Sequence, residues 1–281
     1  MKLVIFAHFD KHDQIKAYVL YYLEQLKKVC DQIIFVSSAS LDYEQCSKLN
    51  NLCTKIIIRE NVGHDFYSYK TGIEAIENMN EVEHLILCND SCFGPLFPLS
   101  DIFTRMALLK ASFWGMSANS RPQLHLQSYF LVFNNKIINS DCFKFFWQEL
   151  QVLNDKDQIV FNYEVGLSQR LTTAGFLAQS FLPVADYKIS FIRLLWRKLV
   201  IYTKELTNRR ESRYSWKTIL EPLQRVDKTI SVFDYSIENY QFPFLKKSLL
   251  NDRWVNQKQL FDLIVKHTNY DINLIKEVVN E

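Results

Sequence analysis

Four short apolar runs, separated by segments with helical spacing, constrain the fold of this chain more than any other feature. The first run, residues 3–9 (LVIFAHF), is continuous and contains β-branched residues, which is typical of a strand buried on both faces of a parallel sheet. Further strands are predicted at 33–37, 55–58 and 84–88, with intervening helices at 13–29, 41–51 and 66–79. This alternation with short connections predicts an α/β fold, in which helices cover both faces of a parallel sheet.

The second half of the chain continues this pattern and then departs from it. Apolar spacing predicts strands at 113–116 and 128–133 and helices near 100–110, 141–153 and 163–174. After about residue 186 the sequence has amphipathic helical patterns, many basic residues and no clear strand. We therefore expect a sheet domain at 1–185 and a C-terminal helical region at 186–281.

Polar residues follow each of the first four predicted strands. Ligands of parallel α/β sheets bind beyond the carboxyl ends of the strands, so these loops are expected to converge on one site. No GxGxxG follows the first strand and the sequence has no P-loop, which argues against a Rossmann dehydrogenase or a P-loop NTPase. The polar loop residues that we assign to this site are His8, Asp10, Ser37, Asn61, Gly63, Asp65, Asn89 and Asp90.

Charge and cysteine usage narrow the class of protein and its compartment. The formal net charge is only +2, whereas a nucleic-acid-binding protein usually carries a stronger basic excess. The six cysteines include no CxxC pair, which is typical of reduced thiols in the cytosol. No apolar window of about 18 residues occurs. We expect a cytoplasmic protein, soluble or peripheral on the membrane, that does not bind nucleic acid.

The segment 84–98 (HLILCNDSCFGPLFP) places a carboxylate at the tip of a strand. The apolar strand ends, Asp90 follows it, and Gly94, Pro95 and Pro98 force a turn. A carboxylate on such a loop is a common ligand of a divalent metal beside a diphosphate. Alternatively, Asp90 caps the turn through an Asx hydrogen bond.

Two further segments combine helix starts with charged residues. In 61–73 (NVGHDFYSYKTGI), Asn61 and Gly63 suit a tight turn before a helix. Asp65 and Lys70 could hold the ribose or diphosphate of a nucleotide. Alternatively, Asp65 caps the helix. In 163–175 (YEVGLSQRLTTAG), Glu164 is either a reactive base or a first-turn carboxylate favoured by the helix dipole.

Arg170, in the segment 163–175, either binds phosphate or pairs with an acid. Another set of side chains suits the recognition of a sugar. Trp114 is either a platform for an acceptor sugar or a core residue, and His125, Gln127 and Ser128 carry groups that hydrogen-bond sugar hydroxyls.

Taken in order, these motifs resemble the rhamnan synthesis protein F family. The matching strings are N-x-G-x-D-F-x-S-Y-K-x-G at 61–72, L-x-N-D-S-x-F-G-P at 87–95, F-W-G at 113–115 and H-x-Q-S-Y-F at 125–130. The string FPFLKK at 242–247 also fits the family's habit of a proline followed by an apolar residue and lysine. The resemblance implies a GT-A-like nucleotide-sugar-binding sheet and the transfer of rhamnose in O-antigen, capsule or rhamnan synthesis.

The resemblance also implies a mechanism and partners. Asp90 aligns with the last carboxylate of the metal-binding triplet of GT-A enzymes and would hold Mg²⁺ or Mn²⁺, although Cys88 replaces the first residue of that triplet. Glu164 takes the place of the base of inverting enzymes, while Tyr163 and Gly166 replace neighbouring acids. The implied donor is dTDP-rhamnose and the implied acceptor is a lipid-linked oligosaccharide. Alternatives are a retaining transferase, a UDP-hexose donor, and a non-catalytic sugar- or nucleotide-binding subunit.

The segment 188–210 (KISFIRLLWRKLVIYTKELTNRR) has apolar residues at helical spacing and a basic rim. This pattern suits a helix lying on the anionic inner-membrane surface, where a lipid-linked acceptor would be found. A packed helix with a solvated basic edge is the alternative.

Overall fold

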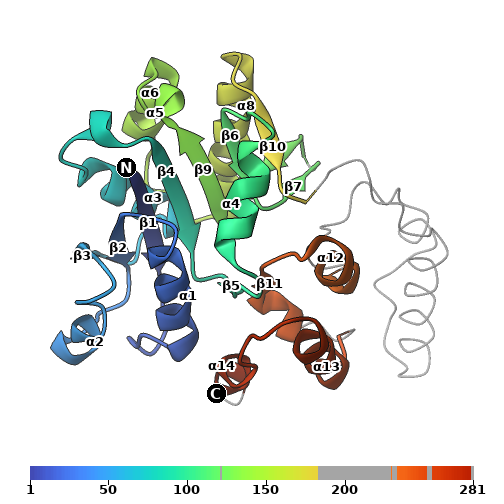
Figure 1. The fold of residues 1–281 in the computed structure, drawn as a ribbon. Coiled ribbons are helices and arrows are strands. Elements are labelled where there is room, and N and C mark those ends of the chain that lie inside the picture. Colours follow the sequence, from blue (N-terminus) through green and yellow to red (C-terminus); the bar gives the residue numbers. More distant parts are fainter. Residues whose placement is uncertain (121, 183–228, 230–232, 252–254, 280–281) are drawn as a thin grey trace, which may run out of the picture.

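The centre of the computed structural model is a seven-stranded sheet with the order β3-β2-β1-β4-β9-β6-β10 (Figure 1). The structure describes residues 1–120, 122–182, 229, 233–251 and 255–279. All neighbouring strands pair in parallel except β9, which is antiparallel to both β4 and β6. The predicted α/β fold is confirmed, and the sheet, which was expected to be parallel, is parallel except at β9. The strands are β1 (Lys2–His8), β2 (Gln32–Ser37), β3 (Lys55–Ile58), β4 (His84–Asn89), β6 (Phe113–Gly115), β9 (Phe130–Asn134) and β10 (Ala178–Ser180).

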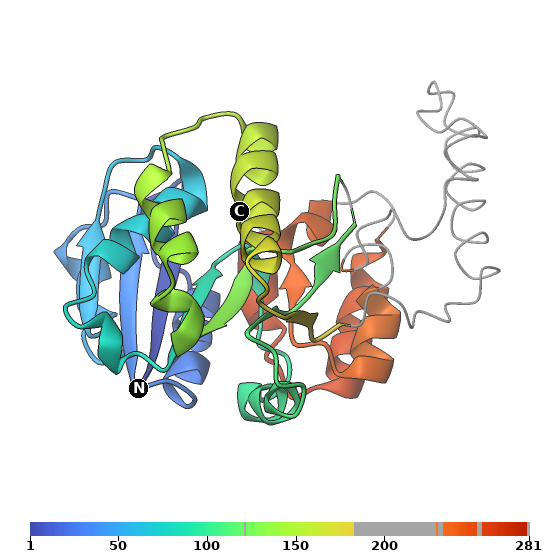
Figure 2. The ribbon, with the colours of Figure 1, turned by 90° about the horizontal axis from the view of Figure 1, so that it is seen from above.

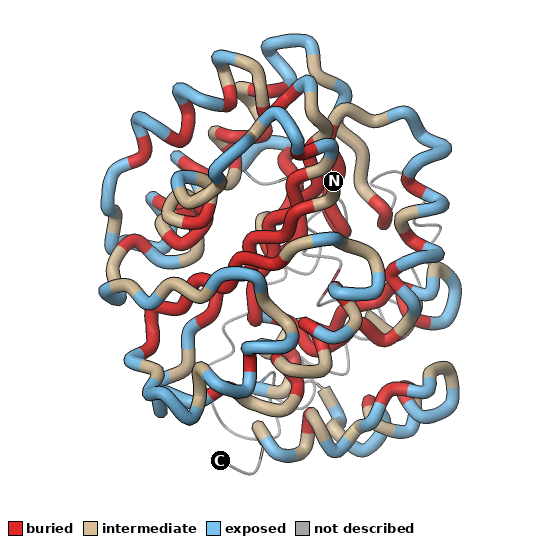
Figure 3. The backbone as a smooth tube through the Cα atoms, turned by 60° about the vertical axis from the view of Figure 1, so that its left-hand side comes forward, coloured by how far each residue is buried: buried red, intermediate tan, exposed pale blue. Residues whose placement is uncertain are grey.

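Alternate residues of the central strands enter two separate apolar clusters, one on each face of the sheet. In β1, Val4 and Phe6 belong to one cluster, and Leu3 and Ile5 belong to the other, which explains why the run is apolar throughout. In Figure 3 the buried strands cross the middle of the molecule, and Figure 2 shows helices on both sides of them. The first face packs against α1 (Ala17–Lys27) and α4 (Leu99–Ala107), and the second against α3 (His64–Glu74), α5 (Asn135–Ile138), α6 (Asp141–Glu149) and α8 (Gly166–Thr173).

Several elements differ from their predicted bounds. The helix expected at 41–51 is only α2 (Tyr43–Ser47), and the one expected at 163–174 is preceded by α7 (Lys156–Ile159) and a π-helical segment, η2 (Val160–Val165). Short strands without an apolar run escaped prediction: β10, and the two-stranded pair β7 (Ala118–Asn119) and β8 (His125–Leu126). In the described ranges, no helix has both the length and the apolar character that crossing a membrane requires.

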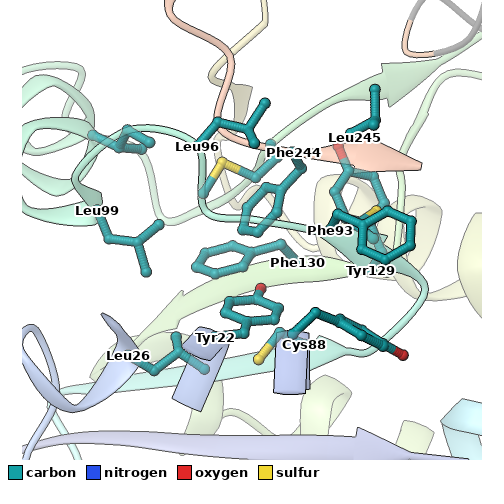
Figure 4. Close-up of a cluster of buried hydrophobic side chains, with 14 of the residues drawn as sticks. Tyr22, Leu26, Cys88, Phe93, Leu96, Leu99, Tyr129, Phe130, Phe244 and Leu245 are labelled. Carbon is teal, nitrogen blue, oxygen red and sulfur yellow. The ribbon is translucent and has the colours of Figure 1, made fainter. Parts of the chain in front are cut away.

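The C-terminal segment packs on the sheet through a short strand that the sequence did not predict. Strand β11 (Leu245–Lys246) pairs antiparallel with β5 (Cys92–Phe93), directly after β4, and the two lie side by side in Figure 1. Phe244 and Leu245 enter the same cluster as Tyr22 of α1 and Phe130 of β9 (Figure 4). The other described elements of this segment are α12 (Phe233–Tyr240), η4 (Lys247–Asn251), α13 (Gln257–His267) and α14 (Asn273–Val279).

The division at residue 186 remains a prediction, and the basic helix expected at 188–210 lies outside the described residues. The described C-terminal residues share one apolar cluster with the sheet.

Gly94 allows the turn after β4 to approach the segment 243–247 closely. Its φ of 138° lies in the region that favours glycine, and a Cβ there would lie 2.4 Å from the carbonyl oxygen of Pro243. The same carbonyl accepts a 2.7 Å hydrogen bond from the backbone N–H of Leu96. A further bond joins the Lys247 N–H to the Ser91 carbonyl at 3.0 Å. The turn after β4 is therefore fixed to residues 243–247 by backbone contacts.

Candidate active site

A cavity of about 510 Å³ opens beyond the carboxyl end of β4. Its lining comes from five parts of the chain: the start of α3, the turn after β4, the segment 119–129, the α7–η2 segment and the start of η4. The position agrees with the expectation that ligands bind beyond the carboxyl ends of the strands. Of the sequence-predicted residues, those in the lining are Asp65, Asn89, His125, Gln127, Ser128 and Glu164.

Glu164 lies in η2, where it meets three hydrogen-bond donors. One carboxylate oxygen accepts from the backbone N–H of Ser128 at 2.7 Å and from its hydroxyl, and the other contacts Nε2 of His125 at 3.1 Å. Burial alone would raise the pKa of Glu164, but the hydrogen bonds from His125 and Ser128 lower it below its usual value. The side chain is 14% exposed, so an ionised carboxylate faces the cavity. Short π-helical segments are frequent at functional sites.

His125 is held between two acceptors. Its Nδ1 lies 2.7 Å from the carbonyl oxygen of Gln123, and its Nε2 lies 3.1 Å from the Glu164 carboxylate. Because a carbonyl oxygen cannot donate, Nδ1 carries a proton, and the second contact needs one further proton between imidazole and carboxylate. The lowered pKa of Glu164 favours the ionised carboxylate as the acceptor in this contact.

Asp65 forms a second polar group with the turn after β4. Asn89 donates to its carboxylate at 2.7 Å, while the amide oxygen of Asn89 accepts from the backbone N–H and the hydroxyl of Ser91 at 3.1 and 2.6 Å. Burial, and next the negative charge of Asp90, raise the pKa of Asp65 from 3.8 to about 6. Asp65 is therefore mainly ionised at neutral pH but takes up a proton easily.

Two features of the loop before α3 place Asp65. Gly63 has a φ of 68°, and a Cβ at this position would lie 2.8 Å from that of Tyr67. Arg59 binds the loop from inside, because its guanidinium donates to the carbonyl oxygens of Glu60, Val62 and His64 at 2.6, 2.6 and 2.7 Å. Asn61, by contrast, is exposed and lies outside the cavity lining.

Asp90 lies beneath the lining and is already paired. Its carboxylate accepts from Lys247 Nζ at 3.0 Å and from the Tyr18 hydroxyl at 3.1 Å, and Lys247 also donates to that hydroxyl at 2.8 Å. The Asp90 side chain is 10% exposed, whereas Lys247 is 32% exposed and lines the cavity. The pair thus presents an ammonium group, rather than a carboxylate, to a ligand.

These surroundings do not fit the predicted divalent metal. Within the described parts of the chain, no group of three His, Cys, Asp or Glu side chains is placed to hold a metal ion. Asp90 offers one carboxylate, which a positive charge already occupies, and a doubly charged ion beside that ammonium would meet a repulsion on the order of several kcal/mol. Mg²⁺ and Mn²⁺ need several oxygen ligands in regular geometry. The assignment of a metal to Asp90 remains a prediction that this geometry does not favour.

Residues at the ends of β1 and β2 support the edge of the sheet next to the site. His8 and Ser37 are buried and join through a 2.9 Å contact between Nδ1 and Oγ, while Nε2 of His8 is buried with no partner among the described residues. Burial lowers the pKa of His8. Asp10 accepts from the backbone N–H groups of His12 and Gln14 at 2.8 and 3.3 Å, so it caps its own turn. None of the three lines the cavity.

Three other predicted ligand residues have structural partners instead. Lys70 donates to the carbonyl oxygens of Gln148 and Leu150 at 3.3 and 3.1 Å, which ties α3 to the end of α6. Arg170 pairs with Glu149 at 2.8 Å, the alternative that the sequence left open. Trp114 is buried against Phe103 and Phe130, as a core residue would be. None of the three lines the cavity.

The sequence did not point to several residues that complete the lining. Lys246 and Lys247 enter it from β11 and η4, and Lys156 and Asn119 from α7 and β7. FPFLKK was recognised as a family string, but no periodicity predicted that it reaches the turn after β4. The one usable signal was two adjacent lysines directly after an apolar run.

Comparisons with known proteins show which family the chain is similar to. A family model described as rhamnan synthesis protein F matches residues 33–207. The virulence protein VirA of Vibrio anguillarum is 27% identical over 220 residues, which cover 76% of this chain and 68% of VirA. The uncharacterised protein y4gN of Sinorhizobium fredii is 27% identical over 164 residues, which cover 57% of this chain and 43% of y4gN.

Among solved structures, the glycosyltransferase GlyE of Streptococcus pneumoniae matches with a TM-score of 0.44 and 12% identity, over 99% of this chain and 62% of GlyE.

Proposed function

We propose that this chain, which belongs to the rhamnan synthesis protein F family, is a glycosyltransferase of polysaccharide synthesis that uses a nucleotide-sugar donor. The observation that carries the proposal is the cavity itself, in which the carboxylate of Glu164 and the ammonium groups of Lys246 and Lys247 share one lining. A base and a site for a leaving anion are the two things that such a transfer requires.

In the proposed reaction, a hydroxyl oxygen of the acceptor attacks the anomeric carbon of the donor sugar. The hydroxyl proton passes to the Glu164 carboxylate. The bond between the anomeric carbon and the diphosphate oxygen breaks, and its electron pair leaves with the nucleoside diphosphate. Because this is a single displacement, the configuration at the anomeric carbon inverts.

The environment of Glu164 both helps and limits this role. Its lowered pKa keeps the carboxylate ionised at neutral pH, which a base needs before it can accept a proton. A lowered pKa also makes a weaker base, so stabilisation of the leaving diphosphate must provide much of the rate. His125 and Ser128 fix the orientation of the carboxylate, and with Gln127 they are the groups that we assign to the acceptor.

We further propose dTDP-rhamnose as the donor and a lipid-linked oligosaccharide as the acceptor. Family membership supports this choice of sugar, and Asp65 and Asn89 line the cavity as candidate partners of the nucleotide ribose. A UDP-hexose is the alternative donor.

The test is a donor panel followed by a variant of the base. dTDP-rhamnose, UDP-galactose, UDP-glucose and UDP-N-acetylglucosamine are each titrated by calorimetry, and transfer to a lipid-linked acceptor is followed by NMR at the anomeric carbon. We expect dTDP-rhamnose to bind best and to give an inverted product.

Glu164→Gln keeps the size of the side chain and removes the base. We expect it to retain donor affinity within about threefold and to lose transfer by at least about 100-fold. The matched control is Glu149→Gln, an exposed glutamate on α6 outside the lining. Retention of the anomeric configuration would refute the single displacement, and donor binding without transfer to any acceptor would instead favour a non-catalytic binding subunit.

A further inference from the structure

We propose that Lys247 takes the place of a divalent metal at this site and binds the diphosphate of the donor directly, an inference that rests on the proposed transferase function. The basis is the contact of Lys247, which lines the cavity, with the buried side chains of Asp90 and Tyr18 behind the lining. A carboxylate after the fourth strand is where a metal was expected. The structure fills that position with an ammonium group from a segment 157 residues further along the chain.

The backbone fixes the position of this lysine. Lys246 pairs with Cys92 across the β11–β5 ladder, and the N–H of Lys247 donates to the Ser91 carbonyl at 3.0 Å. The preceding Phe244 and Leu245 are buried in the core. The backbone of Lys247 is therefore held in place, and its side chain is already fixed by the contact with Asp90. Binding of a ligand would restrict this side chain little further.

The contacts of the ammonium leave it able to take a further ligand. An ammonium group has three N–H donors. Among the described residues, two acceptors are in contact with it, the Asp90 carboxylate at 3.0 Å and the Tyr18 hydroxyl at 2.8 Å, and the ring of Tyr18 lies 5.0 Å from Nζ. Lys247 is about one-third exposed and lines the cavity, so a third N–H is available to a phosphate oxygen.

The role of Asp90 changes accordingly. In the metal interpretation, its carboxylate binds the ion. In the arrangement seen here it is a positioning residue, because its 3.0 Å contact holds the ammonium of Lys247 beside the cavity. Lys246, whose Nζ lies 5.5 Å from the ring centroid of Tyr129, adds a second positive charge to the same lining. Lysine is well suited to phosphate as a compact point charge.

The two interpretations predict opposite effects of removing the lysine. If a metal binds at Asp90, Lys247→Met removes a competing positive charge and strengthens metal-dependent nucleotide binding. If Lys247 binds the diphosphate, the same change weakens nucleotide binding and no metal restores it.

The experiment titrates the full chain with dTDP and with UDP by calorimetry, in EDTA and in Mn²⁺. We expect the unmodified chain to bind one of them in EDTA, with an affinity that Mn²⁺ changes less than threefold. Lys247→Met should weaken binding by roughly 10- to 100-fold, as the loss of a hydrogen bond to a charged group does. Lys247→Arg should restore most of the affinity, and Lys258→Ala, an exposed lysine in α13, should leave it unchanged.

Asp90→Asn gives a second readout that does not depend on the folding of the Lys247 variant. It should weaken binding less than Lys247→Met does, whereas a metal site would lose its one carboxylate. Binding that requires Mn²⁺, disappears in Asp90→Asn and survives in Lys247→Met would overturn this inference and leave the transferase proposal intact. Failure of the unmodified chain to bind either nucleotide, with or without Mn²⁺, would refute both.

Discussion

Three carboxylates lie near the carboxyl end of β4, and they have different partners and therefore different chemistry. They are Asp65, Asp90 and Glu164. Among the described residues, Asp90 pairs with an ammonium group and a tyrosine hydroxyl, Glu164 contacts the ring of His125 and accepts from Ser128, and Asp65 accepts from the amide of Asn89. Asp65 consequently keeps a raised pKa, whereas that of Glu164 is lowered. Residue type alone could not have separated them, because the difference lies in neighbours that come from other elements.

The raised pKa of Asp65 makes stability depend on pH in a definite direction. Its pKa is about 6 when folded, compared with 3.8 for the ordinary group, so the folded chain binds this proton more tightly than the unfolded chain does. The contribution of Asp65 to the free energy of unfolding therefore falls as pH rises from about 4 to about 6. Asp65→Asn removes this dependence.

Urea unfolding of both proteins at several pH values between 4 and 7 measures the effect. The stability of the unmodified chain relative to Asp65→Asn should decline across that window and become level above it. A constant difference from pH 4 to 7 would mean that the carboxyl group has an ordinary pKa.

The left-handed backbone at Gly63 predicts the effect of a substitution on stability. Alanine there must adopt a left-handed conformation and meets Tyr67 at 2.8 Å, so Gly63→Ala should lower the free energy of unfolding by at least about 1–2 kcal/mol. Gly166→Ala is the matched control, because Gly166 has helical angles and its nearest neighbour is at 3.8 Å. It should stabilise the chain by about 0.5–1 kcal/mol. Equal effects of the two changes in chemical denaturation would contradict this account.

At the scale of elements, the apolar runs predicted the sheet well and the short strands poorly. Strands β1, β2, β3 and β4 appear within one or two residues of their predicted ends. Continuous burial on both faces leaves a plain apolar signal in β1, β2 and β4, whereas β3 is a half-exposed edge strand that its three isoleucines still mark. Strands β10 and β11 have three and two residues, and their place depends on distant partners rather than on their own pattern. Lys247 could not be predicted for the same reason, whereas Asp65 and Asn89 could be found because they come at the start of α3 and the end of β4. Glu164 was found from the sequence of the segment 163–175, and the π-helical turn that holds it was not predicted.

The packing of β11 gives an element-scale prediction. Phe244 is buried among Tyr22, Tyr129 and Phe130 (Figure 4). Phe244→Ala should cost about 3–5 kcal/mol of unfolding free energy through the lost contacts and the cavity left behind.

Phe145→Ala is the matched control for that change, since Phe145 is 55% exposed on α6, and it should change stability by no more than about 0.5 kcal/mol. Urea midpoints of both variants provide the comparison. A small effect of Phe244→Ala would show that β11 is not firmly docked.

For the whole molecule, the question is whether the sheet is stable without the C-terminal segment. Described residues beyond 233 cover one face of the sheet and share its apolar cluster. A chain ending at residue 182 should therefore expose a large apolar surface and unfold without a cooperative transition, whereas the full chain should unfold cooperatively. Thermal unfolding followed by circular dichroism, with size-exclusion chromatography, tests this. A monomeric truncated chain with a sharp transition would instead support a domain boundary near residue 186.

The contact between Lys247 and Asp90 also has a consequence for the order of events during synthesis. A ribosome adds about 5–20 residues per second, so roughly 8–30 seconds separate the appearance of these two side chains. Through that interval the turn after β4 has no β-partner and the ammonium is missing from the cavity. If Lys247 binds the diphosphate, a nascent or prematurely released chain that lacks this residue cannot hold a sugar nucleotide firmly, and activity begins only after β11 has paired with β5.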